Sequence, residues 1–144
     1  MVKNDTVELL RECNAGIKMG ISTIDGVLPK VTSGRLSTIL HKYRDKHEQL
    51  GNETERLINE YGEKTKEPNP MAKGMSWIKT NAKMYFDESD NTVSDLITDG
   101  CNMGVKTVNR YINQFDSADD ESKRIARELV QIETELAFEI SPYL

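Results

Sequence analysis

A six-residue motif occurs twice in this chain, as Cys-Asn-Ala-Gly-Ile-Lys at 13–18 and as Cys-Asn-Met-Gly-Val-Lys at 101–106. The two cysteines of the sequence, Cys13 and Cys101, open the two copies. Copies of a motif that stand more than half a chain length apart indicate two similar halves. We therefore predict one domain over residues 1–144 with two pseudo-repeats, at about 5–61 and about 92–140.

Apolar residues recur at alternating spacings of three and four in four segments, a pattern typical of packed amphipathic helices. The first helix is expected to begin at about Asp5, which has Glu8 at capping-box spacing, and to end at Leu28. The other three are expected from the Thr32-Ser33-Gly34 turn to Gly62, from about Thr92 to Phe115, and from the cap-like pair Ser117 and Asp120 to Pro142. No segment alternates with the period of a strand, so the sequence predicts an all-α fold.

The second and third helices are joined by a long connection over 63–90, which Pro68 and Pro70 open. A short amphipathic helix is expected within it, with an apolar stripe at Met71, Met75, Ile78, Ala82 and Tyr85. A connection of this length lets the second pair of helices enter from the opposite end of the first pair. We therefore predict a ferritin-like four-helix bundle with one long crossover that carries a short helix.

Three segments carry a resemblance to a known family. They are the entry to the first helix, the crossover segment and the second copy of the entry motif, written Leu9-Leu10-x-x-Cys13-Asn14-x-Gly16-Ile17, Gly74-x-x-Trp77-x-x-x-x-x-Lys83 and Cys101-Asn102-x-Gly104. With these features the chain resembles a small bacterial ferritin-like family of uncharacterised four-helix-bundle proteins. Members of the wider ferritin-like group often hold two metal ions, with a Glu from each of two helices and a Glu-x-x-His from each of the other two.

That ligand pattern is missing from this sequence. Neither His41 nor His47 has an acidic residue three positions before it. No carboxylate stands between Glu12 and Asp25 in the first helix, or at 100–113 in the third. A di-iron centre needs several hard anionic ligands. We therefore expect no metal site, no cofactor and no catalytic residue.

Glycines interrupt the first and third helices at matching places, at Gly16 and Gly20 and at Gly100 and Gly104. A glycine inside a helix costs roughly 1 kcal/mol relative to alanine. The usual compensation is the close approach of another backbone. We therefore expect the first and third helices to pack closely at these glycines.

A histidine and two cysteines stand on the apolar stripes of the predicted helices. His47 is expected to be a core-edge histidine hydrogen-bonded to a neighbour such as Asn14 or Asn102, and the alternative is a lone metal ligand or a proton-transfer group. Cys13 and Cys101 are expected to be buried free thiols, and the alternative is a redox pair.

Trp77 and Met84 stand seven residues apart on a face of the crossover helix that differs from its inward stripe. An exposed tryptophan with a methionine beside it is typical of a contact surface. We therefore expect Trp77 to lie in a self-association interface, and the commonest form of such an assembly is a two-fold dimer.

The net charge of −5 argues against nucleic acid as a partner, and no apolar run is long enough for a membrane helix or a signal peptide. A cytoplasmic location is therefore expected. The function we expect is that of a non-enzymatic, metal-free structural or protein-interaction bundle whose partner the sequence does not identify. The alternatives are a metal-binding ferritin-like protein in iron handling or oxidative-stress defence, and a redox sensor that uses Cys13 and Cys101.

Overall fold

The computed structural model describes residues 2–66 and 89–144, which form four long helices and two short 3-10 helices. The long helices are α1 (Val2–Val27), α2 (Gly34–Glu60), α5 (Asp90–Gln114) and α6 (Asp120–Ile140). The 3-10 helices η1 (Leu28–Lys30) and η3 (Ser141–Tyr143) follow α1 and α6. Within the two described ranges there is no strand, which confirms the all-α prediction. The short helix expected at 71–85 lies outside the described residues.

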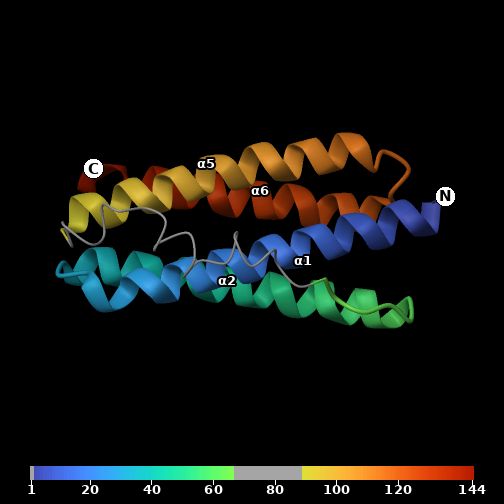
Figure 1. The fold of residues 1–144 in the computed structure, drawn as a ribbon, viewed down its shortest axis with the longest axis horizontal. Coiled ribbons are helices and arrows are strands. Elements are labelled where there is room, and N and C mark those ends of the chain that lie inside the picture. Colours follow the sequence, from blue (N-terminus) through green and yellow to red (C-terminus); the bar gives the residue numbers. More distant parts are fainter. Residues whose placement is uncertain (1, 67–88) are drawn as a thin grey trace.

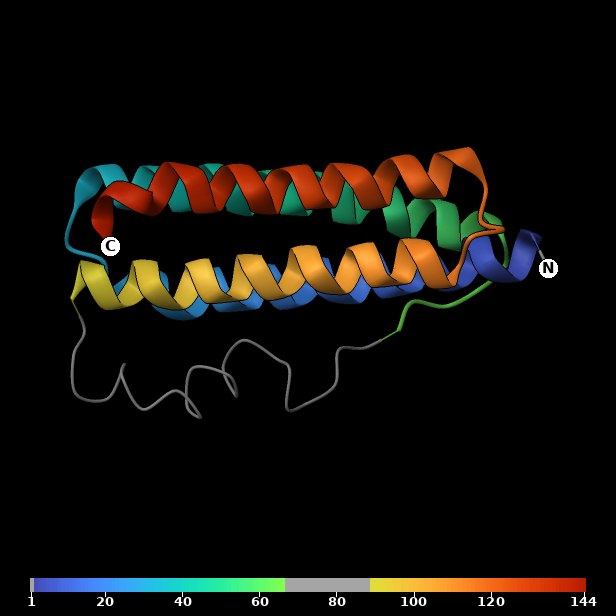
Figure 2. The same cartoon turned by 90° about the horizontal axis from the view of Figure 1, so that it is seen from above.

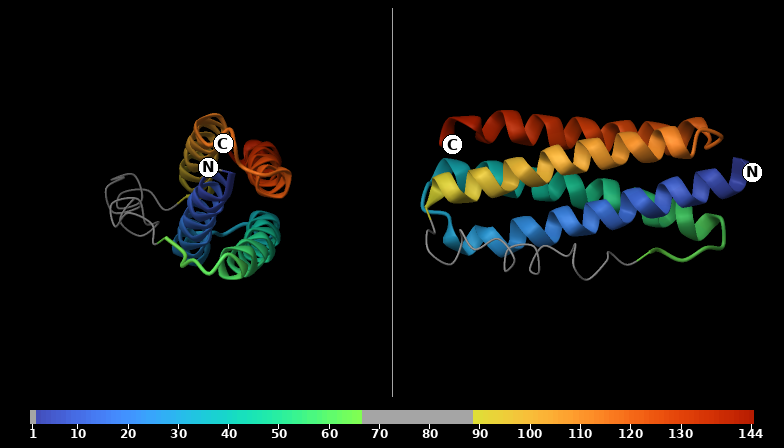
Figure 3. Two further views of the ribbon diagram at one scale, coloured as in Figure 1. Left: turned by 90° about the vertical axis from the view of Figure 1, so that its right-hand side faces the viewer. Right: turned by 45° about the horizontal axis from the view of Figure 1, so that its top comes forward.

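The four helices pack side by side with their long axes roughly aligned (Figure 1). α1 runs antiparallel to α2, and α5 runs antiparallel to α6, while α2 and α5 run in the same direction (Figures 1 and 2). Seen end-on, the helices occupy the four corners of the cross-section (Figure 3). α1 packs against each of the other three helices, whereas α2 and α5 have no substantial contact. Of the two diagonals of this cross-section, the one from α1 to α6 is therefore shorter than the one from α2 to α5.

One apolar cluster fills the space between the helices. Its fully buried side chains come from all four long helices and include Leu9, Ile17, Ile24, Leu40, Ile58, Leu96, Ile125, Leu129 and Leu136. These positions follow the spacing of three and four that the sequence shows, because residues at that spacing share one face of a helix. In the described part of the chain, no helix is both long enough and apolar enough to cross a bilayer.

The helix ends confirm part of the predicted capping. Ser33 caps α2 by accepting a hydrogen bond from the backbone N–H of Leu36, and Gly62 adopts a φ of 73° just beyond its end. Two predicted starts are wrong. α1 begins at Val2 rather than Asp5, and the cap of α6 is Asp119 rather than Ser117. Asp119 accepts from the N–H of Ser122 at 2.8 Å, which a serine two residues earlier does not reach.

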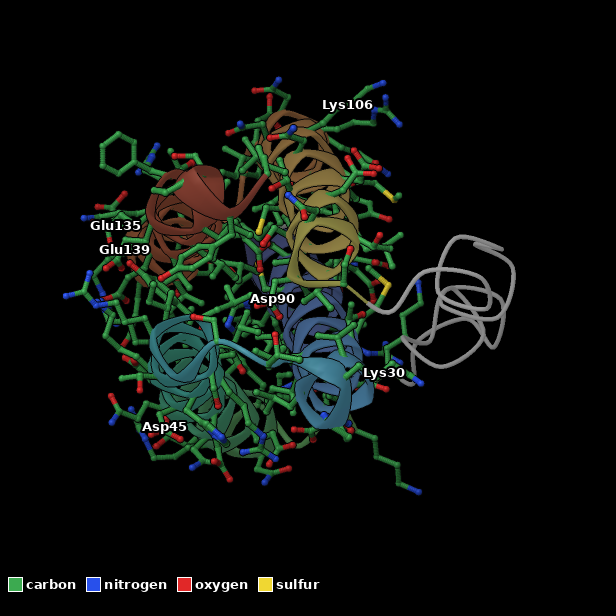
Figure 4. The ribbon with its side chains drawn as sticks, turned by 90° about the vertical axis from the view of Figure 1, so that its left-hand side faces the viewer. Lys30, Asp45, Asp90, Lys106, Glu135 and Glu139 are labelled. Carbon is green, nitrogen blue, oxygen red and sulfur yellow. The ribbon has the colours of Figure 1, made fainter. Side chains whose placement is uncertain are left out.

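Carboxylates and hydroxyls tie the turns at both ends of the bundle to neighbouring helices. At one end, the Asp5 carboxylate accepts from the backbone N–H of Ser117, and the Thr6 hydroxyl accepts from that of Asp119. At the other end, Asp90 lies near the turn between α1 and α2 (Figure 4). It accepts from the N–H and hydroxyl of Thr32 and from the N–H of Ser33, at 2.9, 2.8 and 3.0 Å. The N-terminus of α5 is thereby fixed to the opposite half of the chain.

We predict that Asp90→Ala lowers the free energy of unfolding by about 1–2 kcal/mol, because three donors lose a charged acceptor. The hydrogen bonds from Thr32 and Ser33 lower the pKa of Asp90. The contribution of Asp90 to the free energy of unfolding should therefore be lost as the pH falls through that lowered pKa. The control is Asp99→Ala, at an exposed position of the same helix, which should change stability by no more than about 0.5 kcal/mol. Urea unfolding measures both variants, and equal effects would contradict the prediction.

Candidate functional site

An ion pair between α2 and α6 lies inside the bundle. His47 is 0% exposed and Glu133 is 8% exposed. The Nε2 atom of His47 lies 2.5 Å from Oε1 of Glu133, and its Nδ1 atom lies 2.7 Å from the carbonyl oxygen of Tyr43. The expectation that His47 is a histidine of the core, hydrogen-bonded to a neighbour, is confirmed, but its side-chain partner is Glu133 rather than Asn14 or Asn102. Both ring nitrogens are occupied.

The partners of His47 indicate its protonation state. A carbonyl oxygen only accepts, so Nδ1 has to carry a hydrogen, and the carboxylate is likewise satisfied by a hydrogen on Nε2. An imidazolium meets both requirements. Burial alone lowers the pKa of His47, but the hydrogen bond and charge of Glu133 and the carbonyl of Tyr43 outweigh burial, so this pKa is raised. The pair is thus one cation and one anion with no net charge.

The glycines of α1 and α5 surround this pair. A Cβ at Gly20 would lie 3.0 Å from the His47 ring, and a Cβ at Gly104 would lie 3.4 Å from Oε2 of Glu133. A Cβ at Gly16 would come no closer than 4.0 Å to any atom, here Cδ2 of Leu129, and one at Gly100 would meet nothing within 4 Å. The prediction that these glycines bring α1 and α5 together is therefore wrong. Gly20 and Gly104 accommodate side chains of α2 and α6, and Gly16 and Gly100 relieve no crowding.

A pocket occupies the space between α1 and α5 and has a volume of about 100 Å³. All four glycines line it, and so do His47, Glu133, Leu129 and Leu136 from the other two helices. The remaining walls are mainly apolar, with Met19 and Ile24 from α1 and Ile97, Met103 and Val108 from α5. The pocket thus combines apolar walls with one buried ion pair, the composition expected of a site for a small molecule.

The two cysteines are free and buried, as the sequence predicts. Burial, with a smaller effect of the Glu12 charge, raises the pKa of Cys13 to about 12. Burial and the charge of Glu133, to which Cys101 is also hydrogen-bonded, raise the pKa of Cys101. A reactive thiol needs the opposite shift. The lysine of the second motif copy, Lys106, points away from the bundle (Figure 4) and is exposed.

The other predicted site residues have separate environments. Asn14 is buried and donates to Oγ1 of Thr54 at 3.0 Å and to the carbonyl of Gly51 at 3.4 Å, so it links α1 to α2. Asn102, at the equivalent position of the second motif copy, is exposed. Trp77 and Met84 fall outside the described residues, and the interface assigned to them stays a prediction.

Glu133 is the candidate site residue that the sequence did not predict, although its spacing could have revealed it. It stands four residues after Leu129 and three before Leu136, which are both buried, and therefore lies on the same face of α6. An acid on such a stripe requires a partner, and His47 is the histidine on the corresponding stripe of α2.

No three of the His, Cys, Asp and Glu side chains within 2–66 and 89–144 are grouped so that they could hold a metal ion. His41 is exposed on α2 and stands apart from the buried pair. A scan against protein-family models, a search of curated proteins and a search of solved structures each found no match to this chain.

We predict that His47→Ala lowers the free energy of unfolding by about 3–5 kcal/mol, because Glu133 would keep a buried charge without its partner. The double replacement of His47 and Glu133 by leucine should recover most of this loss, because it removes both charges and keeps the interior filled. Urea unfolding of the single and double variants measures the effect. A double variant as unstable as the single one would contradict this account of the pair.

We also predict that stability declines as the pH rises above 6.5, the ordinary pKa of histidine. The folded chain holds the His47 proton more tightly than the unfolded chain does. The contribution of the pair is therefore complete below pH 6.5 and is lost as the pH rises through the raised pKa. Urea midpoints measured between about pH 6 and 7.5, below the range where the thiols of the unfolded chain ionise appreciably, test this. The double leucine variant should lack the decline, and an equal slope in both proteins would contradict the assignment.

Proposed function

We propose that this protein is a non-enzymatic, metal-free helical bundle that binds a small apolar molecule in the pocket between α1 and α5. The observation that carries the proposal is the pocket of about 100 Å³ whose apolar walls enclose the pair of His47 and Glu133. Pockets of this composition are the usual sites of small ligands, because apolar walls provide affinity and a few fixed polar groups provide orientation.

The glycines give independent support. A glycine costs a helix roughly 1 kcal/mol relative to alanine, and at Gly16 and Gly100 no neighbouring atom requires the absence of a side chain. These two positions lie on the pocket wall. Side chains there would occupy the pocket, so a bound molecule accounts for glycines that helix packing does not explain.

The bundle is proposed to be ferritin-like in topology, which agrees with two antiparallel pairs in which α2 and α5 run in the same direction (Figure 1). The non-enzymatic assignment is supported by the state of the reactive groups. Both nitrogens of His47 are engaged, and the pKa values of Cys13 and Cys101 are raised. Two free thiols also agree with the reducing cytoplasm that we propose as its location.

The test is a titration of the 15N-labelled protein with toluene, followed by the backbone amide signals of the glycines. We expect saturable shifts at Gly16, Gly20, Gly100 and Gly104, together with a higher melting temperature, since a ligand that binds the folded state stabilises it. In Gly100→Phe, the new ring should fill the pocket and abolish both responses.

The matched control is Gly34→Phe, at an exposed glycine with no atom within 4 Å of its Cβ position and outside the pocket lining. This variant should bind toluene as the unmodified protein does. A cooperative thermal transition shows that each variant is folded. Absence of saturable shifts in the unmodified protein, or unchanged binding in Gly100→Phe, would refute the proposed function.

A further inference from the structure

One oxygen of Glu133 is among the polar groups on the pocket lining, which also includes Glu12, Thr23, Thr107 and Tyr111. Its Oε1 atom is engaged by His47, and its Oε2 atom lies 3.4 Å from the Cβ position of Gly104, a residue of the pocket wall. Cys101 also forms a hydrogen bond to Glu133, but a thiol is a weak donor. A carboxylate oxygen accepts more than one hydrogen bond, so Glu133 retains accepting capacity toward a molecule in the pocket.

The charges around this oxygen disfavour both kinds of ion. An anionic ligand beside Glu133 would receive no hydrogen bond from His47, because both ring nitrogens already donate to Tyr43 and Glu133. The second acid on the pocket lining, Glu12, is already paired with Lys66 and has no donor for an anion. A cationic ligand would lose its hydration beside a carboxylate that His47 already neutralises, so little attraction would offset that loss. An uncharged donor meets neither penalty.

The shape of the pocket limits the apolar part of the ligand. Along α1 the lining extends from Glu12 to Ile24, and along the antiparallel α5 it extends from Tyr111 to Ile97 (Figure 2). At the rise of an α-helix this length is roughly 18 Å. A volume of about 100 Å³ spread over that length describes a narrow groove. A slender chain fits such a groove better than a bulky ring system does.

We infer that the pocket takes an uncharged, slender aliphatic molecule whose hydroxyl group donates a hydrogen bond to the free oxygen of Glu133. This inference rests on the proposed function, because it specifies the ligand of the same pocket. The alcohol is recognised by one charge-assisted hydrogen bond and by apolar contacts along α1 and α5, which include Met19 and Met103. A molecule with the same aliphatic chain but no hydrogen-bond donor cannot form the hydrogen bond to Glu133.

The test compares four eight-carbon probes at pH 6, where the buried pair holds its proton. These are 1-octanol, 2-octanone, octylammonium and octanoate, each titrated into the full-length protein and followed by the glycine amide signals. We expect 1-octanol to bind at least about tenfold more tightly than the other three, as one hydrogen bond to a charged group allows. Gly100→Phe should abolish binding of all four.

Glu133→Gln provides a readout that a change in pocket size would not give. It removes the charge that keeps His47 protonated, so Nε2 becomes an acceptor and the amide N–H donates to it, which leaves an uncharged carbonyl oxygen toward the pocket. The preference for 1-octanol over 2-octanone should therefore fall to within about threefold, because the hydrogen bond from the alcohol is no longer charge-assisted. Should this variant fail to unfold cooperatively, the comparison of the four probes on the unmodified protein decides the question alone.

The outcomes separate this inference from the proposed function. If toluene binds and the four probes bind equally, or if 2-octanone, octylammonium or octanoate binds best, the alcohol assignment is wrong and the pocket remains a binding site. If neither toluene nor any octyl probe binds, both proposals fail together.

Discussion

His47 and Glu133 form a hydrogen-bonded ion pair in the apolar interior of the bundle, where a lone charge on either residue would cost several kcal/mol. Their contact is short, and it fixes the register of α2 against α6 because each side chain has to reach the other. It also excludes a side chain at position 20, since Gly20 lies against the imidazole ring. The neighbouring groups Cys101 and Gly104 face the same carboxylate. The packing at this level of the bundle is therefore set by an electrostatic requirement.

The pocket follows from that arrangement. α1 packs against α6 across the short diagonal, and between α1 and α5 the glycines leave a space that the neighbouring side chains do not fill. Hydrogen bonds at the two ends of the bundle, through Asp5 and Thr6 at one end and Asp90 at the other, tie the turns to the neighbouring helices. Helices tied at both ends would favour the preorganised binding proposed above.

The sequence was a reliable guide to the helices and an incomplete guide to the site. The apolar spacing located all four long helices to within a few residues, because burial of one helix face repeats with a fixed period. His47 was found, because a histidine stands out on an apolar stripe. Glu133 was missed, since a single acid in a helix rich in surface charge looks like a solvated residue. The two asparagines of the repeated motif looked equivalent, yet Asn14 is buried and Asn102 is exposed. Identical residues acquire different environments when their helices rotate differently about their axes.

The amino-acid sequence alone determined the all-helical class, the approximate extent of the helices and the inward position of Cys13, Cys101 and His47, because these depend on local periodicity. Only the tertiary structure decided which residue neutralises His47, what the glycines face and where a pocket forms. Those properties depend on the relative rotation and offset of helices whose paired residues, such as His47 and Glu133, lie far apart in the chain. The helical period fixes which face of a helix is buried, but it does not fix the residue that meets that face across the bundle.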